Sequence, residues 1–149
     1  MKTPILDSMI KVMESVAQEQ RPFSMEDFFY NMPSDLSQVT HTCNTAACII
    51  GYCVIDNDFR DKFLPYAHIK NSSVRDVCRD VCHMLVNEIG EELAGSIFEC
   101  TAEDRAESLS KIDDHKNIAT LIISEHVLSD NDCPLDALEY IKDVRSYLH

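Results

Sequence analysis

The sequence predicts an all-α protein, built as one compact domain over residues 1–149 with seven to eight short to medium helices. Only three glycines and five prolines interrupt the chain, too few for the many tight turns of a β-sandwich or barrel. Apolar residues recur at helical spacing, and no segment shows the alternation of a half-buried strand. The hydrophobic fraction of 45% is typical of a folded domain.

The first helix is expected to begin at Thr3 and Pro4, because threonine caps helices and proline suits the first helical position. Its apolar stripe consists of Ile5, Leu6, Met9, Ile10, Met13, Val16 and Ala17. Arg21–Pro22 ends this helix. A short helix over residues 24–30 is expected next, with Ser24 and Asp27 as its capping pair.

The stretch HTCNTAACIIGYCVID, residues 41–56, contains three of the seven cysteines in the most apolar run of the chain. Asn44 or Thr45 is expected to cap a buried helix over about residues 46–55, which Asp56, Asn57 and Asp58 would close. Residues 59–71 predict a short helical turn and a loop, with Pro65 as the breaker.

Ser73 is expected to cap the most regular helix, which Gly90 would end in a left-handed conformation. A short helix with an acidic first turn follows, and then one that Thr101 and Asp104 would cap. The helix near residues 113–128 is expected to bury Ile118, Leu121, Ile122 and Leu128. The last helix, led in by Asp132 or Cys133 and Pro134, is expected to bury Leu135, Leu138, Ile141, Val144 and Leu148.

The charge is strongly negative and uneven. Thirteen Lys and Arg stand against 26 Asp and Glu, a net charge of −13; residues 73–149 alone hold seven against seventeen. Direct nucleic-acid binding is therefore not expected, because phosphate contacts need concentrated Lys and Arg. A protein with a basic surface would be attracted instead. The carboxylates expected to bind it are Glu99, Glu103, Asp104, Glu107, Asp113 and Asp114.

The chain is expected to be cytoplasmic. Charged residues interrupt residues 1–20, so they do not resemble a signal peptide. The longest uncharged apolar run, residues 46–55, is too short to cross a bilayer, so no membrane association is expected. Seven cysteines without a disulfide-type spacing indicate free thiols in a reducing compartment.

Because of its cysteines, the protein could alternatively be an enzyme. Cys43 precedes a predicted helix start and Cys48 would lie in its first turn, where the helix dipole favours a thiolate. A histidine at position 41, 68 or 83 could act as the base. No oxyanion loop or nucleophile signature accompanies them, so we expect no catalytic residue.

A metal site and an anion site are the other possibilities. Cys78 and Cys82 share a helix face beside His83, but the chain has no C-x-x-C knuckle, so we expect no metal and no other cofactor. Residues 42–48 could receive a phosphate at a helix start, with counter-charge from Arg60, Arg75 and Arg79. No glycine occurs in this loop, so neither nucleotide fingerprint is present.

Residues 43–54, CNTAACIIGYCV, resemble a family of small, largely uncharacterised proteins of phages and bacterial mobile elements. That family shares a C-G-T-x-x-C-x-x-G-W-A-like helix start, an L-G-x-x-x-x-x-A-x-x-L-F segment and a T-x-x-x-A helix. The first is matched by Cys43, Thr45, Cys48 and Gly51, with Asn44 and Tyr52 replacing its glycine and tryptophan. The others are matched by Ile89, Gly90, Ala94, Ile97, Phe98, Thr101, Ala106 and Leu109.

The resemblance covers about residues 41–110 and implies a phage-type accessory protein in a bacterial cell. It carries no catalytic residue over. The residues of the first motif read as structural: Asn44 tolerates the positive φ that a glycine there suggests, Thr45 caps, Cys48 packs and Gly51 admits a neighbouring helix.

Together these observations predict a non-enzymatic protein that binds, and most simply inhibits, a host or defence protein with a basic surface. The alternatives are a sponge that sequesters a nucleotide signal at a helix N-terminus, and a cysteine-dependent enzyme that uses Cys43 or Cys48.

Overall fold

The computed structural model describes residues 2–25, 47–65, 73–99, 101–114, 118–129 and 133–149, apart from the side chains of residues 126–129. These residues form eight helices and no strand, which confirms the all-α prediction. An isolated parallel bridge between Phe23 and Ala47 joins the segment after the first helix to the segment before the second. The helices are α1 (Pro4–Gln18), α2 (Ile49–Ile55), α3 (Asn57–Phe63), α4 (Val74–Ile89), α5 (Glu91–Phe98), α6 (Ala102–Ser110), α7 (Ile118–Ser129) and α8 (Pro134–Leu148).

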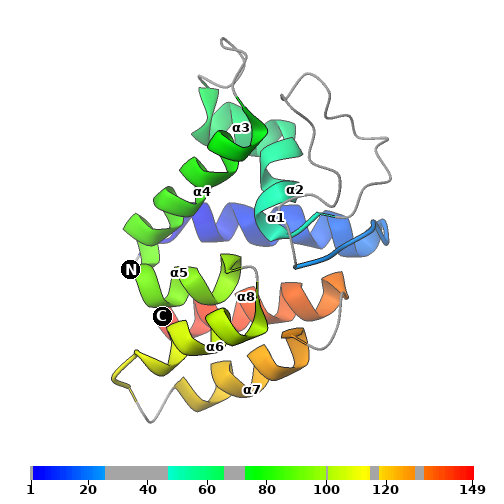
Figure 1. Cartoon of the computed structure of the whole chain (residues 1–149). Helices are drawn as coiled ribbons and strands as arrows, with labels where there is room; N and C mark the ends of the chain where they lie inside the picture. Colours follow the sequence, from blue (N-terminus) through cyan, green and yellow to red (C-terminus); the bar gives the residue numbers. More distant parts are fainter. Residues whose placement is uncertain (1, 26–46, 66–72, 100, 115–117, 130–132) are drawn as a thin grey trace.

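Helix α1 crosses the middle of the molecule. Helices α2, α3 and α4 lie on one side of it, and α5, α6, α7 and α8 on the other (Figure 1). Its predicted stripe is correct: every member is buried except Ala17, which is partly buried, and Val12 is buried as well. The buried side chains form one continuous apolar cluster to which all eight helices contribute.

The N-terminus of α1 is held from another helix. Thr3 is the N-cap residue, as expected, but its hydroxyl donates to the Asp7 carboxylate at 3.0 Å and caps no backbone group. The carboxylate of Glu88 on α4 accepts the backbone N–H groups of Ile5 and Leu6, each at 2.8 Å. These two N–H groups have no partner within the helix, so Glu88 acts as a cap from 82 residues away.

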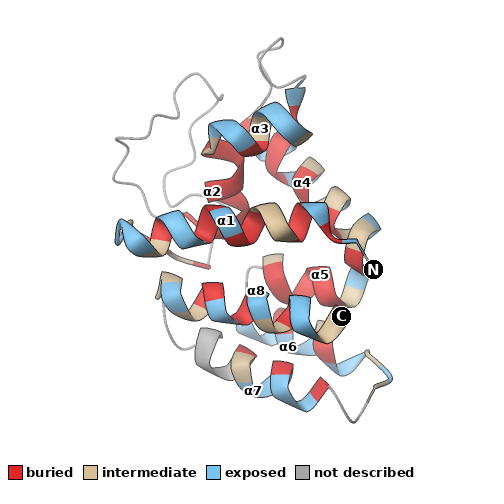
Figure 2. Ribbon diagram, turned by 180° about the vertical axis from the view of Figure 1, so that it is seen from behind, coloured by how far each residue is buried: buried red, intermediate tan, exposed pale blue. Residues whose placement is uncertain are grey.

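Helix α2 is the most buried helix, with every residue from Ile49 to Ile55 buried, as Figure 2 shows. The expected start of this helix is wrong. It begins at Ile49 with Cys48 as its N-cap residue, and no side chain caps it, because residue 47 is held in the bridge to Phe23. Cys48 therefore precedes the first turn, and Asn44 and Thr45, the predicted capping residues, lie outside the described residues.

Asp56 ends α2 and starts α3. Its backbone N–H is bonded to the end of α2, and its side chain accepts the N–H of Phe59 at 2.9 Å. Helix α3 consequently starts at Asn57, earlier than the turn expected after residue 59. Phe59 anchors α3 in the core, and its ring contacts that of Phe63 in a tilted arrangement with ring centroids 4.9 Å apart.

Helix α4 follows its prediction, with Ser73 at the N-cap position and its whole predicted face buried. Gly90 has a φ of 93°, which side chains rarely tolerate, and joins α4 directly to α5. The expected positive φ is therefore present, and one glycine both ends α4 and starts α5.

Two predicted inner faces are partly wrong. Ile122 on α7 is 38% exposed and Leu135 on α8 is 57% exposed, whereas Glu125 is buried. Ile118, Leu121, Leu138, Ile141 and Val144 are buried as expected. Leu148 is half-buried, and the side chain of Leu128 lies outside the described part of the chain.

Within the described residues, no helix has both the length and the apolar content that a bilayer crossing requires. The helix expected over residues 24–30 also falls largely outside the described ranges.

Candidate interaction surface

The acidic helix α6 begins with a side-chain cap. The Oγ1 of Thr101 accepts the backbone N–H of Asp104 at 3.0 Å, as the sequence predicts. Glu103 and Asp104 lie in the first turn, where the positive end of the helix dipole stabilises carboxylates. The cap fixes where the helix starts and therefore where these carboxylates point.

Beneath the carboxylates, α6 is anchored by a buried ion pair. The Nε of Arg105 donates to Oε1 of Glu125 on α7 at 2.6 Å, and the two side chains are only 3% and 4% exposed. The Nη1 of Arg105 also donates to the backbone carbonyl of Glu99 at 3.0 Å. One arginine thus ties α6 to α7 and to the end of α5.

Helix α6 also lies very close to α5. A Cβ added at Gly95 would be 2.5 Å from the Oγ of Ser108 and 3.1 Å from its Cβ. A side chain at position 95 would force Ser108 to shift, and Leu109, the next residue on α6, is buried. Helix α6 is therefore packed closely against α5 and bonded to α7, and its outer side is polar.

The predicted binding carboxylates are distributed along this unit. Glu103, Asp104 and Glu107 are exposed on α6, and Asp113 is exposed in the segment that follows. Asp114 is half-buried and accepts the Tyr147 hydroxyl at 3.1 Å; burial and this carboxylate both raise the pKa of Tyr147. Glu99 is half-buried at the end of α5. The accessible part of the predicted surface is therefore centred on α6.

Among the described residues, few cations lie against the carboxylates of α6. Glu103 and Glu107 are four residues apart, a spacing at which like charges destabilise a helix. Glu107 has a loose contact with Lys111 at 3.9 Å, exposed on both sides, which contributes little. Glu103 and Asp104 form no ion pair with any residue that the structure describes.

The thiols of α2 and α4 share one interface. Cys53 and Cys78 are buried, and burial together with the neighbouring thiols raises the pKa of both. Cys48 is 3% exposed, which leaves a substrate little access to its sulfur. Gly51 is buried in the same helix, whereas Cys43, Asn44 and Thr45 lie outside the described residues.

No group of three His, Cys, Asp or Glu residues in the described ranges is placed to hold a metal ion. The four thiols at this interface, which belong to Cys48, Cys53, Cys78 and Cys82, are therefore close without converging on one point. Their arrangement matches the packing role that the sequence indicates for Cys48.

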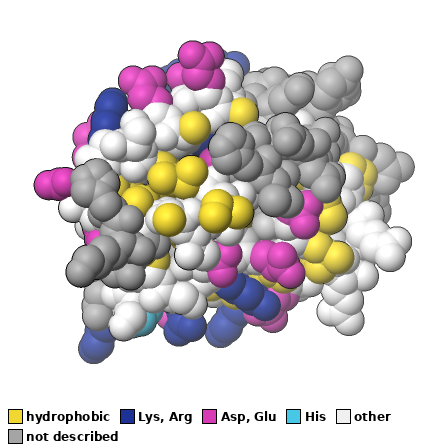
Figure 3. Space-filling model, turned by 90° about the horizontal axis from the view of Figure 1, so that it is seen from below, with side chains coloured by type: hydrophobic (Ala, Val, Ile, Leu, Met, Phe, Trp, Pro, Cys, Tyr) yellow, Lys and Arg dark blue, Asp and Glu magenta, His cyan; other side chains and the backbone are white. Residues whose placement is uncertain are grey.

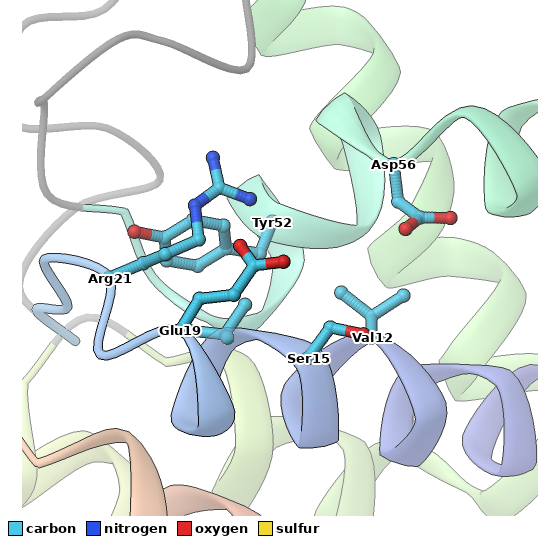
Figure 4. Close-up of a pocket in the computed structure, with 7 residues that line it drawn as sticks. Val12, Ser15, Glu19, Arg21, Tyr52 and Asp56 are labelled. Atoms are coloured by element: carbon cyan, nitrogen blue, oxygen red, sulfur yellow. The ribbon is translucent and has the colours of Figure 1, made fainter.

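A separate cavity of about 340 Å³ lies between α1 and α2 (Figure 4). The Arg21 guanidinium lies over the Tyr52 ring, 4.7 Å from its centroid, and the Tyr52 hydroxyl donates to the carbonyl of Pro22. Glu19 and Asp56 also line the cavity, so its lining carries more negative than positive charge. A phosphate group would be poorly accommodated there.

The arginines proposed for a nucleotide site do not gather near this cavity. Arg60 bonds to Asn57 on its own helix, and Arg75 and Arg79 are exposed on α4. Sequence reasoning did not identify Arg105, Glu125, Arg21 or Tyr52 as important. The one feature of the sequence that could have indicated the buried ion pair is Glu125, the only charged residue in a mostly apolar helix.

No protein-family model, curated protein or solved structure matches the chain.

Proposed function

We propose that this protein acts by binding, and so inhibiting, a protein with a basic surface, and that the exposed carboxylates of α6 are the centre of the contact. The observation that carries the proposal is a capped helix that presents Glu103, Asp104 and Glu107 to solvent. The cap at Thr101 and the buried Arg105 hold that helix in place. Because the backbone that carries the carboxylates is already helical before binding, docking loses no conformational entropy in folding it.

Electrostatic complementarity of this kind accelerates association and selects partners by charge. It also explains why a like-charge spacing, Glu103 and Glu107, is compatible with the fold: its cost is a few tenths of a kcal/mol, which binding can offset. The resemblance of residues 41–110 to phage-type proteins supports a bacterial host or defence protein as the target. In that role the carboxylates would occupy positions where a basic protein otherwise receives phosphates.

The test compares two sets of neutralising substitutions with equal charge change. The first is Glu103→Gln, Asp104→Asn and Glu107→Gln together. The matched control is Glu14→Gln, Asp58→Asn and Asp76→Asn, because all three are exposed and two of them lie in the first turns of α3 and α4. Both proteins and the wild type are immobilised and exposed to bacterial lysate.

We expect the wild type and the control to retain the same partner, and salt of about 0.5 M to release it because salt screens exposed charges. The α6 variant should retain at least tenfold less, a loss of about 1.4 kcal/mol or more. A partner held equally by both variants, or one unaffected by salt, would contradict the proposal. The retained partner is then identified and its own activity measured with and without the protein.

A further inference from the structure

Most of the described side chains on the side of helix α7 that faces away from the core are apolar, although Thr120 is exposed there as well. Ile118 and Leu121 pack into the core, as one side of a surface helix should. On the other side, Ile123 is 67% exposed, Ile122 is 38% exposed and Ala119 is exposed. A surface helix normally carries polar residues there, so this side, termed the α7 face and defined by Ala119, Ile122 and Ile123, needs an explanation.

The α7 face lies at one end of the molecule. Helix α7 packs mainly against α6 and α8, and no other described helix covers it. Figure 3 views this end and shows apolar side chains grouped across it, with acidic side chains and some Lys or Arg side chains around them. Two of the three large apolar residues that are exposed in the described chain belong to this one helix.

Both helices that pack against α7 carry carboxylates. Helix α6 contributes the exposed Glu103, Asp104 and Glu107. Helix α8 contributes Asp143, which accepts the hydroxyl of Ser124 on α7 at 3.0 Å, and the exposed Glu139. An apolar centre with a charged border is the usual anatomy of a protein–protein contact.

We propose that the α7 face is the apolar centre of the same contact, and that its occupant is an amphipathic helix or ridge with Leu, Ile or similar residues at its middle and Lys or Arg along both edges. This inference rests on the proposed function and names the partner surface. The apolar centre supplies the affinity, and the border of carboxylates selects basic edges over acidic ones.

A second copy of this chain is a poor occupant. In a twofold dimer the same patch faces itself, so the carboxylates of α6 and α8 would meet other carboxylates across the interface. With a net charge of −13 on each chain, this contact would be repulsive. The charge pattern therefore favours a basic partner.

The test uses three synthetic helical peptides of equal length. The first has a Leu/Ile face flanked by lysines, the second has the same face flanked by glutamates, and the third keeps the lysines but has Ser and Gln in place of the apolar face. Their affinities for the purified full chain are measured by fluorescence anisotropy. We expect the first to bind at least tenfold more tightly than either of the others.

Two substitutions then locate the contact. Ile123→Asp adds a negative charge, which by itself would strengthen attraction to lysines, so any weakening must come from the lost apolar contact. Leu135→Asp makes the same change at an exposed leucine in the first turn of α8 and is the matched control. We expect Ile123→Asp to lower the affinity for the first peptide to that for the third, and Leu135→Asp to leave it within about twofold. Circular dichroism checks that both variants fold.

The outcomes separate the two proposals. If the wild type binds the first and third peptides equally, or if Ile123→Asp binds the first peptide as the wild type does, the α7 face is not a docking site, although the carboxylates can still be one. If neither lysine peptide binds in dilute salt, the proposed function fails as well. A dimer of the wild type that Ile123→Asp abolishes in sedimentation would make a second copy the occupant and overturn the inference.

Discussion

The guanidinium of Arg105 and the carboxylate of Glu125 meet at 2.6 Å, with both side chains almost completely buried between α6 and α7. Removing two charges from water is costly, so a buried ion pair adds little net stability. Leaving one of its charges buried without the other is strongly destabilising. The effect of the pair is to fix the position of α6 relative to α7, and therefore the spacing between the acidic border and the α7 face.

Removal of one partner of this pair should be more damaging than removal of both. Arg105→Met leaves the Glu125 carboxylate buried without its nearest cation, and we expect the free energy of unfolding to fall by about 3–5 kcal/mol. The double variant Arg105→Met/Glu125→Leu should be less destabilised than Arg105→Met alone. Urea denaturation of the wild type, Arg105→Met, Glu125→Leu and the double variant measures this in a double-mutant cycle. Additive losses would show that the two side chains do not depend on each other.

The contact of Glu88 with the start of α1 should contribute measurably to stability. In Glu88→Ala the N–H groups of Ile5 and Leu6 lose their acceptor, and we expect a loss of about 1–3 kcal/mol. Asn87→Ala, at the exposed neighbouring position, is the control and should change stability by about 0.5 kcal/mol or less. Equal effects in the two variants, compared by urea denaturation, would mean that water replaces Glu88 without cost.

Alanine at position 95 should separate α5 from α6. Alanine favours a helix interior over glycine by about 0.5–1 kcal/mol, but the new Cβ collides with Ser108, and overpacking costs about 1–3 kcal/mol. We expect Gly95→Ala to be destabilised, and Ser108→Ala to recover part of the loss because it removes the nearer atom. Thermal unfolding of the two single variants and the double variant provides the measurement. A Gly95→Ala variant more stable than the wild type would refute the close approach.

The buried thiols of Cys53 and Cys78 should make the protein lose stability at alkaline pH. Their pKa values are raised in the folded state by burial, whereas in the unfolded chain a thiol ionises near pH 8.5. The unfolded state therefore releases protons first, and stability is complete below about pH 8.5 and falls above it. Each thiol contributes a slope of up to about 1.4 kcal/mol per pH unit.

The measurement is the free energy of unfolding in urea between neutral pH and about pH 10, where tyrosines also begin to ionise. Cys53→Ala/Cys78→Ala should show a shallower fall than the wild type, even if its stability at neutral pH is lower. Cys133→Ala, at a half-buried position before α8, should keep the wild-type slope. Identical slopes in all three proteins would exclude the thiols as the cause.

The helices with one clear apolar stripe could be predicted from the sequence, because periodic burial is a local property. Helices α1 and α4 show this: nearly all of their expected inner residues are buried. The caps at Thr101 and Gly90 were also predictable, since each depends on residues only a few positions away.

Helix α7 could not be oriented in this way. Its apolar residues lie all around the helix, so periodicity does not distinguish an inner position such as Leu121 from an outer one, and Ile122 was wrongly expected inside. Only the position of Arg105 on another helix explains why Glu125 is buried, and that contact joins residues 20 positions apart. The start of α2 likewise depends on the bridge from Phe23 to Ala47, which no local pattern indicates.

Helices α1 and α8, the first and last of the structure, pack against each other, and Arg145 bonds to Asp7 across 138 positions of sequence at 2.6 Å. A ribosome adds about 5–20 residues per second. The side of α1 that faces α8 therefore stays uncovered for on the order of 10 s, until α8 has been synthesised. During synthesis this apolar side is available to chaperones and to other nascent chains. Helix α8, which is synthesised long after α1, is thus the helix that covers this side of α1.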